Sequence, residues 1–154
     1  MVKRERRTDG IDPAARSRAR RRAVQALYAW QMSGSSMAEI IDQFRHEQDM
    51  EVADLAYFED LLNGVEREHE GIDEALGPWL DRTIEEVDPL ERAVLRMAGY
   101  ELKFRDDVPY RVVLNEAIEA AKRFGADFGH TYVNGVLDHA AAAWRSAEYA
   151  KSQL

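Results

Sequence analysis

The sequence contains no cysteine, only four prolines and nine glycines, and no long apolar run. Without cysteine the chain cannot form disulfides, thiolate metal sites, iron–sulfur clusters or a cysteine nucleophile, and such a composition fits a reducing compartment. No apolar stretch approaches the roughly 18 residues of a membrane span, and the basic start lacks the apolar segment of a secretory signal. We therefore expect a cytoplasmic protein with no membrane contact, whose core is stabilised by packing alone.

Recognisable enzyme signatures are also missing. The chain has no phosphate-cradling glycine-rich loop, no nucleophile elbow and no zincin helix. Glu66 and His69 have the spacing of a di-iron bundle motif, but they stand in a dense charge run of the kind that usually forms a solvated helix face. The sequence therefore predicts no catalytic site, no metal site, no cofactor and no small-molecule substrate.

Apolar residues recur every three or four positions almost everywhere, without the sustained alternation of strands. This periodicity predicts an all-α fold of seven or so helices with no sheet, and 154 residues fit one domain. We expect a single helical domain at 12–145, with packed subdomains at about 12–80 and 81–145. A flexible basic arm at 1–11 precedes it and a frayed tail at 146–154 follows it.

Helix starts are marked unequally along the chain. Asp88 followed by Pro89 combines a capping side chain with a proline at the first helical position, which predicts a helix start there. Asp127 is expected to cap the last long helix. Gly135 interrupts that helix and predicts the close approach of another helix at this position.

The charges are distributed unevenly. The whole chain carries a net charge of −8, yet residues 1–22 hold nine basic and three acidic residues, a net charge of +6. The remainder therefore carries −14. Such asymmetry indicates a basic element that meets a polyanion and an acidic body that repels it; a solvated basic tail without a partner is the alternative.

An arginine cluster near the start of the first helix is the strongest local signal. At about 100° per residue, Arg18, Arg21 and Arg22 point away from the apolar face. Arg16 and Arg20 lie near the edge of that face. Because arginine suits planar, bidentate contact with phosphate and stacking on bases, the cluster favours RNA or DNA binding over a merely solubilising helix face.

Aromatic residues supply the stacking that single-stranded bases require. Phe128 and Tyr132 lie at or near the start of the last long helix, where free backbone N–H groups also favour an anion. Tyr28 falls off the apolar stripe of the first helix and is a candidate contact residue. Ordinary packing at the helix entry remains the alternative for Phe128 and Tyr132, and spacing does not decide between the two.

Eight short sequence blocks stand in order between Pro13 and Ala143. They are R-x-R-A-R at 16–20, A-V-Q-A-L-Y at 23–28, D-P-L-E-R-A-V-L-R at 88–96, Y-E-L at 100–102, D-V-P-Y at 107–110, N-E-A at 115–117, A-K-R-F-G at 121–125 and Y-V-N-G-V-L-D at 132–138. Together they resemble the NusB family of bacterial transcription antitermination factors. The resemblance covers nearly the whole predicted domain and leaves the arm outside.

The resemblance implies an all-α fold of two packed three-helix bundles and a function without catalysis. It implies binding to the boxA element of ribosomal RNA leader transcripts, together with the small-subunit ribosomal protein that serves as NusE. It further implies assembly with other Nus factors on RNA polymerase, which suppresses premature termination.

The resemblance also implies roles for individual residues. Arg16, Arg18 and Arg20 match the family's arginine-rich RNA-binding start, and Tyr132 matches an aromatic residue near the RNA. Glu91 lies on the side that faces NusE, with Tyr28 near that surface.

Two departures from the family pattern concern these roles. Ser17 stands where relatives can carry another arginine, while Arg21 and Arg22 add charge nearby. Phe128 and Gly129 replace what is often a short polar stretch, which adds either a stacking surface or only packing.

Two other classes of protein compete with an RNA-binding adaptor. One is the helical RNA-targeting domain that is fused to some ribosomal RNA methyltransferases, but the chain has no cofactor-binding segment, so this role requires a further polypeptide. The other is a helix-turn-helix DNA-binding protein, but no recognition helix of suitable polarity follows a short turn.

Overall fold

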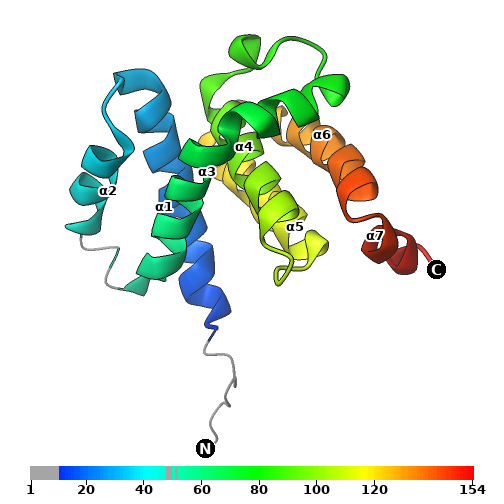
Figure 1. Cartoon of the computed structure of the whole chain (residues 1–154), viewed down its shortest axis with the longest axis horizontal. Coiled ribbons are helices and arrows are strands. Elements are labelled where there is room, and N and C mark those ends of the chain that lie inside the picture. The colour runs from blue at the N-terminus through cyan, green and yellow to red at the C-terminus, as the bar shows by residue number, and fades with distance from the viewer. Residues whose placement is uncertain (1–10, 48–49, 51) are drawn as a thin grey trace, which may run out of the picture.

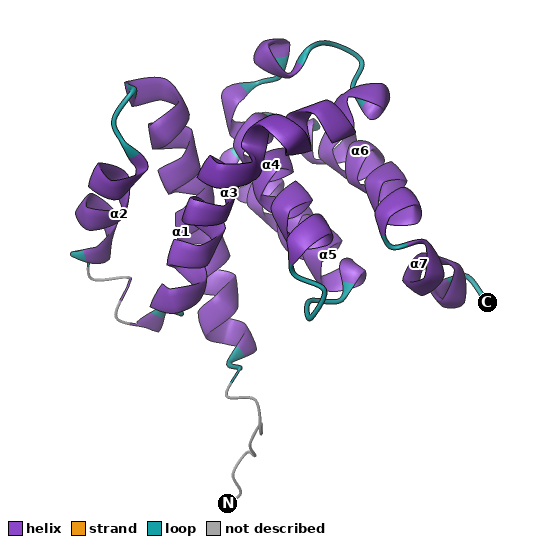
Figure 2. Ribbon diagram, viewed as in Figure 1, coloured by secondary structure: helices purple, strands orange, loops and turns teal. Residues whose placement is uncertain are grey.

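The computed structural model describes residues 11–47, 50 and 52–154. Within these residues the chain forms seven α-helices and no strand, which confirms the predicted fold class (Figures 1 and 2). The helices are α1 (Pro13–Ser33), α2 (Met37–Arg45), α3 (Leu55–Leu76), α4 (Pro89–Phe104), α5 (Tyr110–Phe124), α6 (Gly129–Trp144) and α7 (Ser146–Ser152). Two 3-10 turns, η2 (Gly77–Trp79) and η3 (Ile84–Glu86), connect α3 to α4. The predicted basic arm lies outside the described residues except for Ile11.

The helices form two groups of three that share one core. Helices α1, α2 and α3 pack together, as do α4, α5 and α6, and α4 also packs against both α1 and α3. Figure 1 shows α1 and α2 at one end of the molecule and α6 and α7 at the other. Because the buried apolar side chains of both groups form a single cluster, the predicted subdomains are halves of one core.

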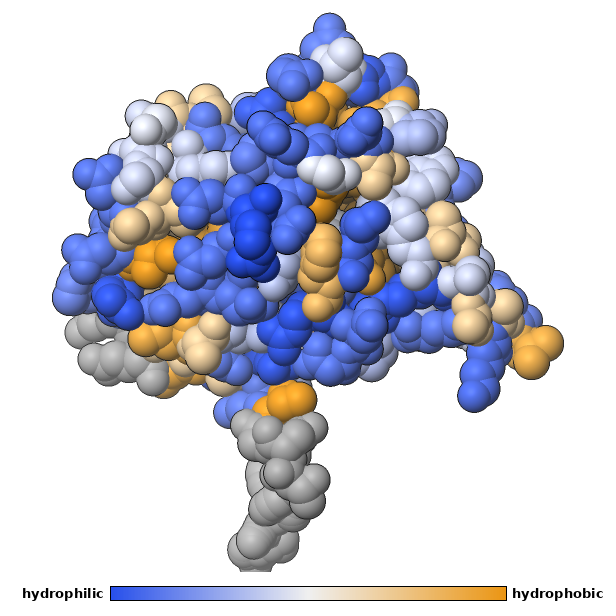
Figure 3. All heavy atoms as spheres, viewed as in Figure 1, coloured by the Kyte–Doolittle hydropathy of each residue, from blue (hydrophilic) through white to orange (hydrophobic). Residues whose placement is uncertain are grey.

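The surface is largely polar on the face that Figure 3 shows, where apolar side chains form separate small patches among hydrophilic ones. No helix in the described part of the chain is long and apolar enough to cross a membrane. Hydrophilic side chains therefore make up most of this face.

The helix start at Asp88 is confirmed, and the one at Asp127 is wrong. The Asp88 carboxylate accepts hydrogen bonds from the backbone N–H groups of Leu90 at 3.1 Å and Glu91 at 3.2 Å. Helix α6 instead begins after Phe128, which has a left-handed φ of 68° and makes no side-chain capping bond. The start of α6 therefore depends on a turn with an unusual backbone rather than on a polar cap.

Close helix approaches occur at glycines other than Gly135. A Cβ atom added to Gly135 would meet nothing within 4 Å, so the predicted close approach there is wrong. A Cβ at Gly64 in α3 would overlap the ring of Tyr100, and a Cβ at Gly99 in α4 would overlap Ile72. The missing side chains of Gly64 and Gly99 let α3 and α4 pack closely.

The C-terminal segment differs from the frayed tail predicted at 146–154, because residues 146–152 form α7. The Tyr149 ring packs on the Tyr110 ring with centroids 5.3 Å apart. A carboxylate oxygen of Glu148 accepts a hydrogen bond from the Tyr110 backbone N–H at 2.8 Å, which satisfies a free amide at the start of α5. Two specific contacts therefore stabilise a segment that lacks an apolar pattern.

Candidate nucleic-acid interface

Arg20 is buried, which contradicts its predicted place in the RNA contact. Its Nε donates to the two carboxylate oxygens of Glu101 at 3.2 and 3.0 Å, and its Nη2 lies 2.9 Å from one of them. The Tyr57 hydroxyl donates to the same carboxylate. Burial of its ring and the charge of Glu101 raise the pKa of Tyr57. Arg20 therefore stabilises the junction of α1, α3 and α4 and is withdrawn from solvent.

Arg16 takes part in the same structural cluster. Its guanidinium lies 4.1 Å from the centroid of the Tyr57 ring and forms an ion pair with Asp54 at 3.6 Å. Arg20 and Arg105 also face this ring, at 5.2 and 4.8 Å. Since cation–π contacts of this kind are attractive, we call Arg16, Arg20, Arg105, Tyr57 and Glu101 the Tyr57 cluster and assign it to stability.

Two further arginines of α1 face α2 and the start of α3. Arg18 donates through Nη1 to the backbone oxygen of Val52 at 3.1 Å. Arg22 forms an ion pair with Glu47, and its guanidinium lies 5.1 Å from the centroid of the Phe44 ring. Both charges are accessible in part, but each already has a contact within the protein.

Arg21 differs from these neighbours, because no hydrogen bond or ion pair joins it to any residue that the structure describes. With Arg123 of α5 it lines a small hollow of about 120 Å³, whose rim also includes Glu116 and Glu119. Arg21 therefore presents a guanidinium without a fixed partner at the side of α1 that faces α5.

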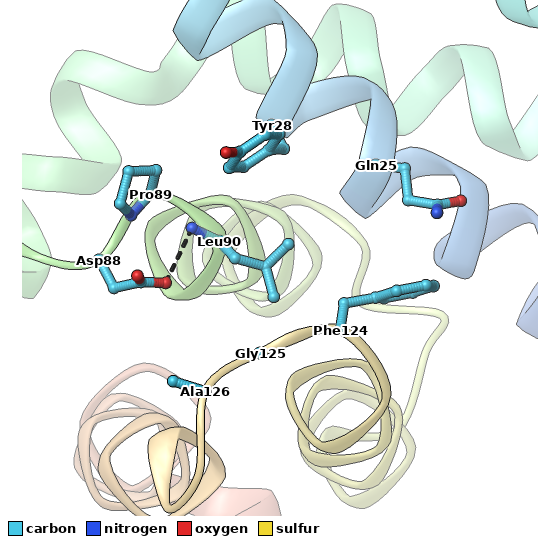
Figure 4. A pocket seen from close by; sticks show the side chains of 8 residues that line it. All are labelled: Gln25, Tyr28, Asp88, Pro89, Leu90, Phe124, Gly125 and Ala126. Carbon is cyan, nitrogen blue, oxygen red and sulfur yellow. Dashed lines mark hydrogen bonds between the residues drawn. The ribbon is translucent and has the colours of Figure 1, made fainter.

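A second hollow, a groove of about 450 Å³, lies between α1, the start of α4 and the end of α5 (Figure 4). Its lining residues are Gln25, Tyr28, Asp88, Pro89, Leu90, Phe124, Gly125 and Ala126. Figure 4 shows Gln25 and Tyr28 of α1 above the start of α4 and the turn between α5 and α6. Tyr28 is exposed and lines the groove, which agrees with its predicted position off the apolar stripe.

Phe128 is 79% exposed, which excludes the core alternative that the sequence left open. Its positive φ of 68° is uncommon for a residue with a side chain and costs on the order of 1–3 kcal/mol. No burial of the phenyl ring offsets that cost. Such strain at an exposed aromatic residue is typical of a contact site.

Tyr132 is half-buried in the first turn of α6, where it meets a segment that sequence reasoning missed. Its hydroxyl accepts a hydrogen bond from the Asp81 backbone N–H at 3.4 Å, and the Arg82 guanidinium lies 5.1 Å from its ring centroid. Burial is the main cause that raises the pKa of Tyr132. No sequence signal links positions 81 and 132, because the connection between η2 and η3 reaches α6 only in the folded chain.

Glu91 is only 7% exposed, so it offers little surface to a partner. Its carboxylate packs against Gly129, where an added Cβ atom would overlap it. Burial raises the pKa of Glu91, the charge of Asp88 raises it further, and Arg82 opposes both. The Glu91 carboxylate therefore packs against the first turn of α6, at Gly129.

No group of three or more histidine, cysteine, aspartate or glutamate residues in the described ranges could hold a metal ion. The Glu66 and His69 pair, which has the spacing of a di-iron motif, is joined through the Glu66 backbone oxygen and His69 Nδ1 at 3.0 Å. The candidate contact groups on this surface are therefore cations and aromatic rings rather than metal ligands.

These features define an all-α protein of two packed three-helix bundles in which the aromatic side chains of Tyr28 and Phe128 are exposed. The model of the NusB family matches residues 17–142, and the chain belongs to that family. It is 70% identical over 142 residues to the transcription antitermination protein NusB of Stenotrophomonas maltophilia (strain K279a), covering 92% of this chain and 89% of that protein. It is 66% identical over 145 residues to the protein of the same name from Xylella fastidiosa (strain 9a5c), covering 94% and 92%.

Solved structures agree with this assignment. T. maritima NusB is 31% identical, superposes with a TM-score of 0.71, and is covered over 89% of its length by 81% of this chain. A crystal structure of the antitermination factors NusB and NusE in complex with dsRNA has a chain that is 24% identical, with a TM-score of 0.66 and coverage of 88% and 96%. The second likeness shows the fold alone.

Proposed function

We propose that this chain is a non-catalytic transcription antitermination factor that binds RNA. Membership of the NusB family supports the antitermination role, and relatives that share about two thirds of their residues with this chain carry that name. The residues that would contact RNA follow from the surface rather than from the relatives.

The observation that carries the proposal is a set of cations and aromatic rings that α1, the end of α5 and the start of α6 present. We call Arg21, Arg123, Tyr28, Phe128 and Tyr132 the α1–α6 strip. Arg21 and Arg123 line one hollow, and Tyr28 lines the groove at the start of α4. The chain then runs from that groove through the turn at Ala126 to Phe128 and α6. The strip combines two cations with three aromatic rings, which suits an RNA backbone and its bases.

Single-stranded RNA is the nucleic acid that fits this strip. Exposed aromatic rings stack only on bases that are not paired, and arginines bind the phosphates between them. The net charge of −14 beyond residue 22 disfavours wrapping a long polyanion around the body. We therefore propose boxA of ribosomal RNA leader transcripts as the RNA, bound by the strip with help from Arg18 and Arg22.

The proposed protein partner is NusE, a basic ribosomal protein, for which the acidic body offers complementary charge. A NusB structure similar in fold was solved with NusE and dsRNA together, which supports a joint complex of the two proteins on RNA. The groove that Tyr28 and Asp88 line is the hollow that we propose for NusE. In that complex the factor joins other Nus factors on RNA polymerase.

Binding of fluorescent boxA RNA and of a scrambled strand, each with and without NusE, tests the proposal. We expect tighter binding to boxA than to the scrambled strand when NusE is present. The Arg21→Ala variant should weaken binding to both strands and reduce the salt slope by about one. Loss of one phosphate contact means that fewer counterions are released on binding. Equal affinity for both strands in the presence of NusE would contradict a boxA-specific factor.

A further inference from the structure

The Arg82 guanidinium lies over the ring of Tyr132, which the proposed function puts beside RNA. Its guanidinium carbon lies 5.1 Å from the centroid of the Tyr132 ring. The residue comes from the connection between η2 and η3, and its neighbour Asp81 donates a backbone hydrogen bond to the Tyr132 hydroxyl at 3.4 Å. This connection is therefore attached to the first turn of α6 at two points.

The local contacts of Arg82 leave it free to bind a ligand. Its Nε and Nη2 donate to the Asp81 carboxylate at 2.7 and 2.8 Å, whereas Nη1 makes no hydrogen bond within the described part of the chain. The ion pair joins adjacent residues whose side chains are 43% and 59% exposed. Exposed pairs of this kind contribute little to stability, so maintaining the fold does not explain why the guanidinium stands over Tyr132.

The surroundings of Arg82 indicate a phosphate rather than a protein carboxylate as its ligand. Phe128 is the N-cap of α6 and Tyr132 lies in the first turn of that helix, so both aromatic residues belong to the start of α6. A guanidinium can stack on an aromatic ring while its N–H edge binds phosphate, which a lysine ammonium cannot do. Arg82, Tyr132 and Phe128 thus combine one charged edge with two π surfaces at the start of α6.

We propose that Arg82 is a further RNA-contact residue, which stacks on Tyr132 and binds a phosphate of single-stranded RNA through its Nη1 edge. The assignment rests on the proposed function, because it requires that RNA lies along the start of α6. Asp81 is a positioning residue in this arrangement: its carboxylate holds Nε and Nη2, which turns the Nη1 edge outward.

The test compares Arg82→Ala with the matched control Arg45→Ala. Arg45 is also an arginine paired with one carboxylate, Glu59, at 2.7 Å, and its side chain is 42% exposed. It ends α2, at the opposite end of the molecule from α6 (Figure 1). We expect Arg82→Ala to weaken boxA binding about fivefold and to reduce the salt slope by about one, while Arg45→Ala binds like the unsubstituted chain.

Two more variants separate an RNA contact from a structural role. Arg82→Lys keeps the charge and should preserve the salt slope while losing part of the affinity. In the Tyr132→Leu background, Arg82→Ala should cost less affinity than it does alone, because the stacked pair is already broken. All these proteins should melt within a few degrees of the unsubstituted chain, since Arg82 is exposed and leucine keeps most of the packing volume of the half-buried Tyr132.

The outcomes distinguish this assignment from the proposed function. If the unsubstituted chain binds RNA with NusE and Arg82→Ala binds equally well, the assignment of Arg82 is wrong and the proposed function stands. A loss of affinity that follows a loss of the folded state would also overturn the assignment. If the unsubstituted chain does not bind boxA at all, the proposed function fails first.

Discussion

Tyr57 and Tyr132 each have an arginine side chain over the ring, and these two tyrosines differ chiefly in burial. Tyr57 is buried among Arg16, Arg20 and Arg105, and its hydroxyl donates to the Glu101 carboxylate. Tyr132 is half-buried and carries only Arg82, whose own ion pair is open to solvent. A buried charge without its partner is costly, whereas an exposed one can exchange its partner for a ligand. The same pairing therefore stabilises the fold at one place and is available for binding at the other.

The largest expected effect is the loss of stability in Arg20→Ala. This change leaves the Glu101 carboxylate buried without its main partner, and breaking a buried ion pair in this way typically costs about 3–5 kcal/mol. Urea denaturation should show a correspondingly lower free energy of unfolding. RNA binding should fall only to the extent that the protein unfolds.

Arg21→Ala is the matched control for that prediction, because it changes the next residue of α1. It should alter the free energy of unfolding by less than about 0.5 kcal/mol while weakening RNA binding. A folded Arg20→Ala protein of normal stability with lost RNA affinity would reverse the roles that burial assigns to these two arginines.

The second prediction compares the two tyrosine hydroxyls. Tyr57→Phe removes a hydrogen bond to a buried carboxylate and should lower the free energy of unfolding by about 1.5–3 kcal/mol. Tyr132→Phe removes only a long bond of 3.4 Å at the surface and should stay within about 0.5 kcal/mol. Thermal melts of both variants measure the difference, and equal losses would mean that Tyr132 also belongs to the core.

The sequence predicts the fold better than it predicts this contrast. Helical periodicity and the Asp88 cap are local, so they identify the all-α class and the start of α4. The angle around α1 placed Arg20 at the edge of the apolar face, but its partner Glu101 lies 81 positions away. Whether such a side chain turns inward depends on that distant carboxylate, which periodicity cannot show.

The start of α6 was predicted incompletely for a related reason. Phe128 and Tyr132 were recognised by type and position, yet the exposure of Phe128 follows from a left-handed turn that only the backbone reveals. Arg82 was missed because it meets Tyr132 only through the folding of the η2–η3 connection onto α6. The resemblance implies that Glu91 faces NusE, whereas the packing of its carboxylate against Gly129 of another helix shows only in the folded chain.

The third prediction uses the strain at Phe128. Phe128→Gly places a residue that accepts positive φ at this turn and should raise the free energy of unfolding by about 1 kcal/mol. The same change removes the exposed ring and should weaken boxA binding about fivefold, if one stacked base is worth roughly 1 kcal/mol. In this one variant the free energy of unfolding, measured by chemical denaturation, should rise while the affinity for boxA, measured by RNA titration, should fall. A more stable Phe128→Gly protein with unchanged RNA affinity would remove Phe128 from the strip.

The smallest expected effect concerns Glu91 and depends on pH. Burial raises the pKa of Glu91 in the folded state above its unfolded value, so the folded protein retains this proton over a range in which the unfolded chain has lost it. The contribution of Glu91 to stability is therefore full below the unfolded pKa and is lost as the pH rises through the folded pKa. Glu91→Gln removes the charge that is penalised at neutral pH.

We accordingly expect Glu91→Gln to be more stable than the unsubstituted chain at pH 7, and this advantage should disappear when denaturation is measured below the ordinary glutamate pKa of 4.5. The matched control is Glu66→Gln, because Glu66 lies exposed on α3. An advantage of Glu91→Gln that persists unchanged at low pH would show that charge is not the cause. If Glu91→Gln also binds NusE with unchanged affinity and salt dependence, the carboxylate acts by supporting Gly129 and α6, as its burial indicates, and not as a charge that the partner reads.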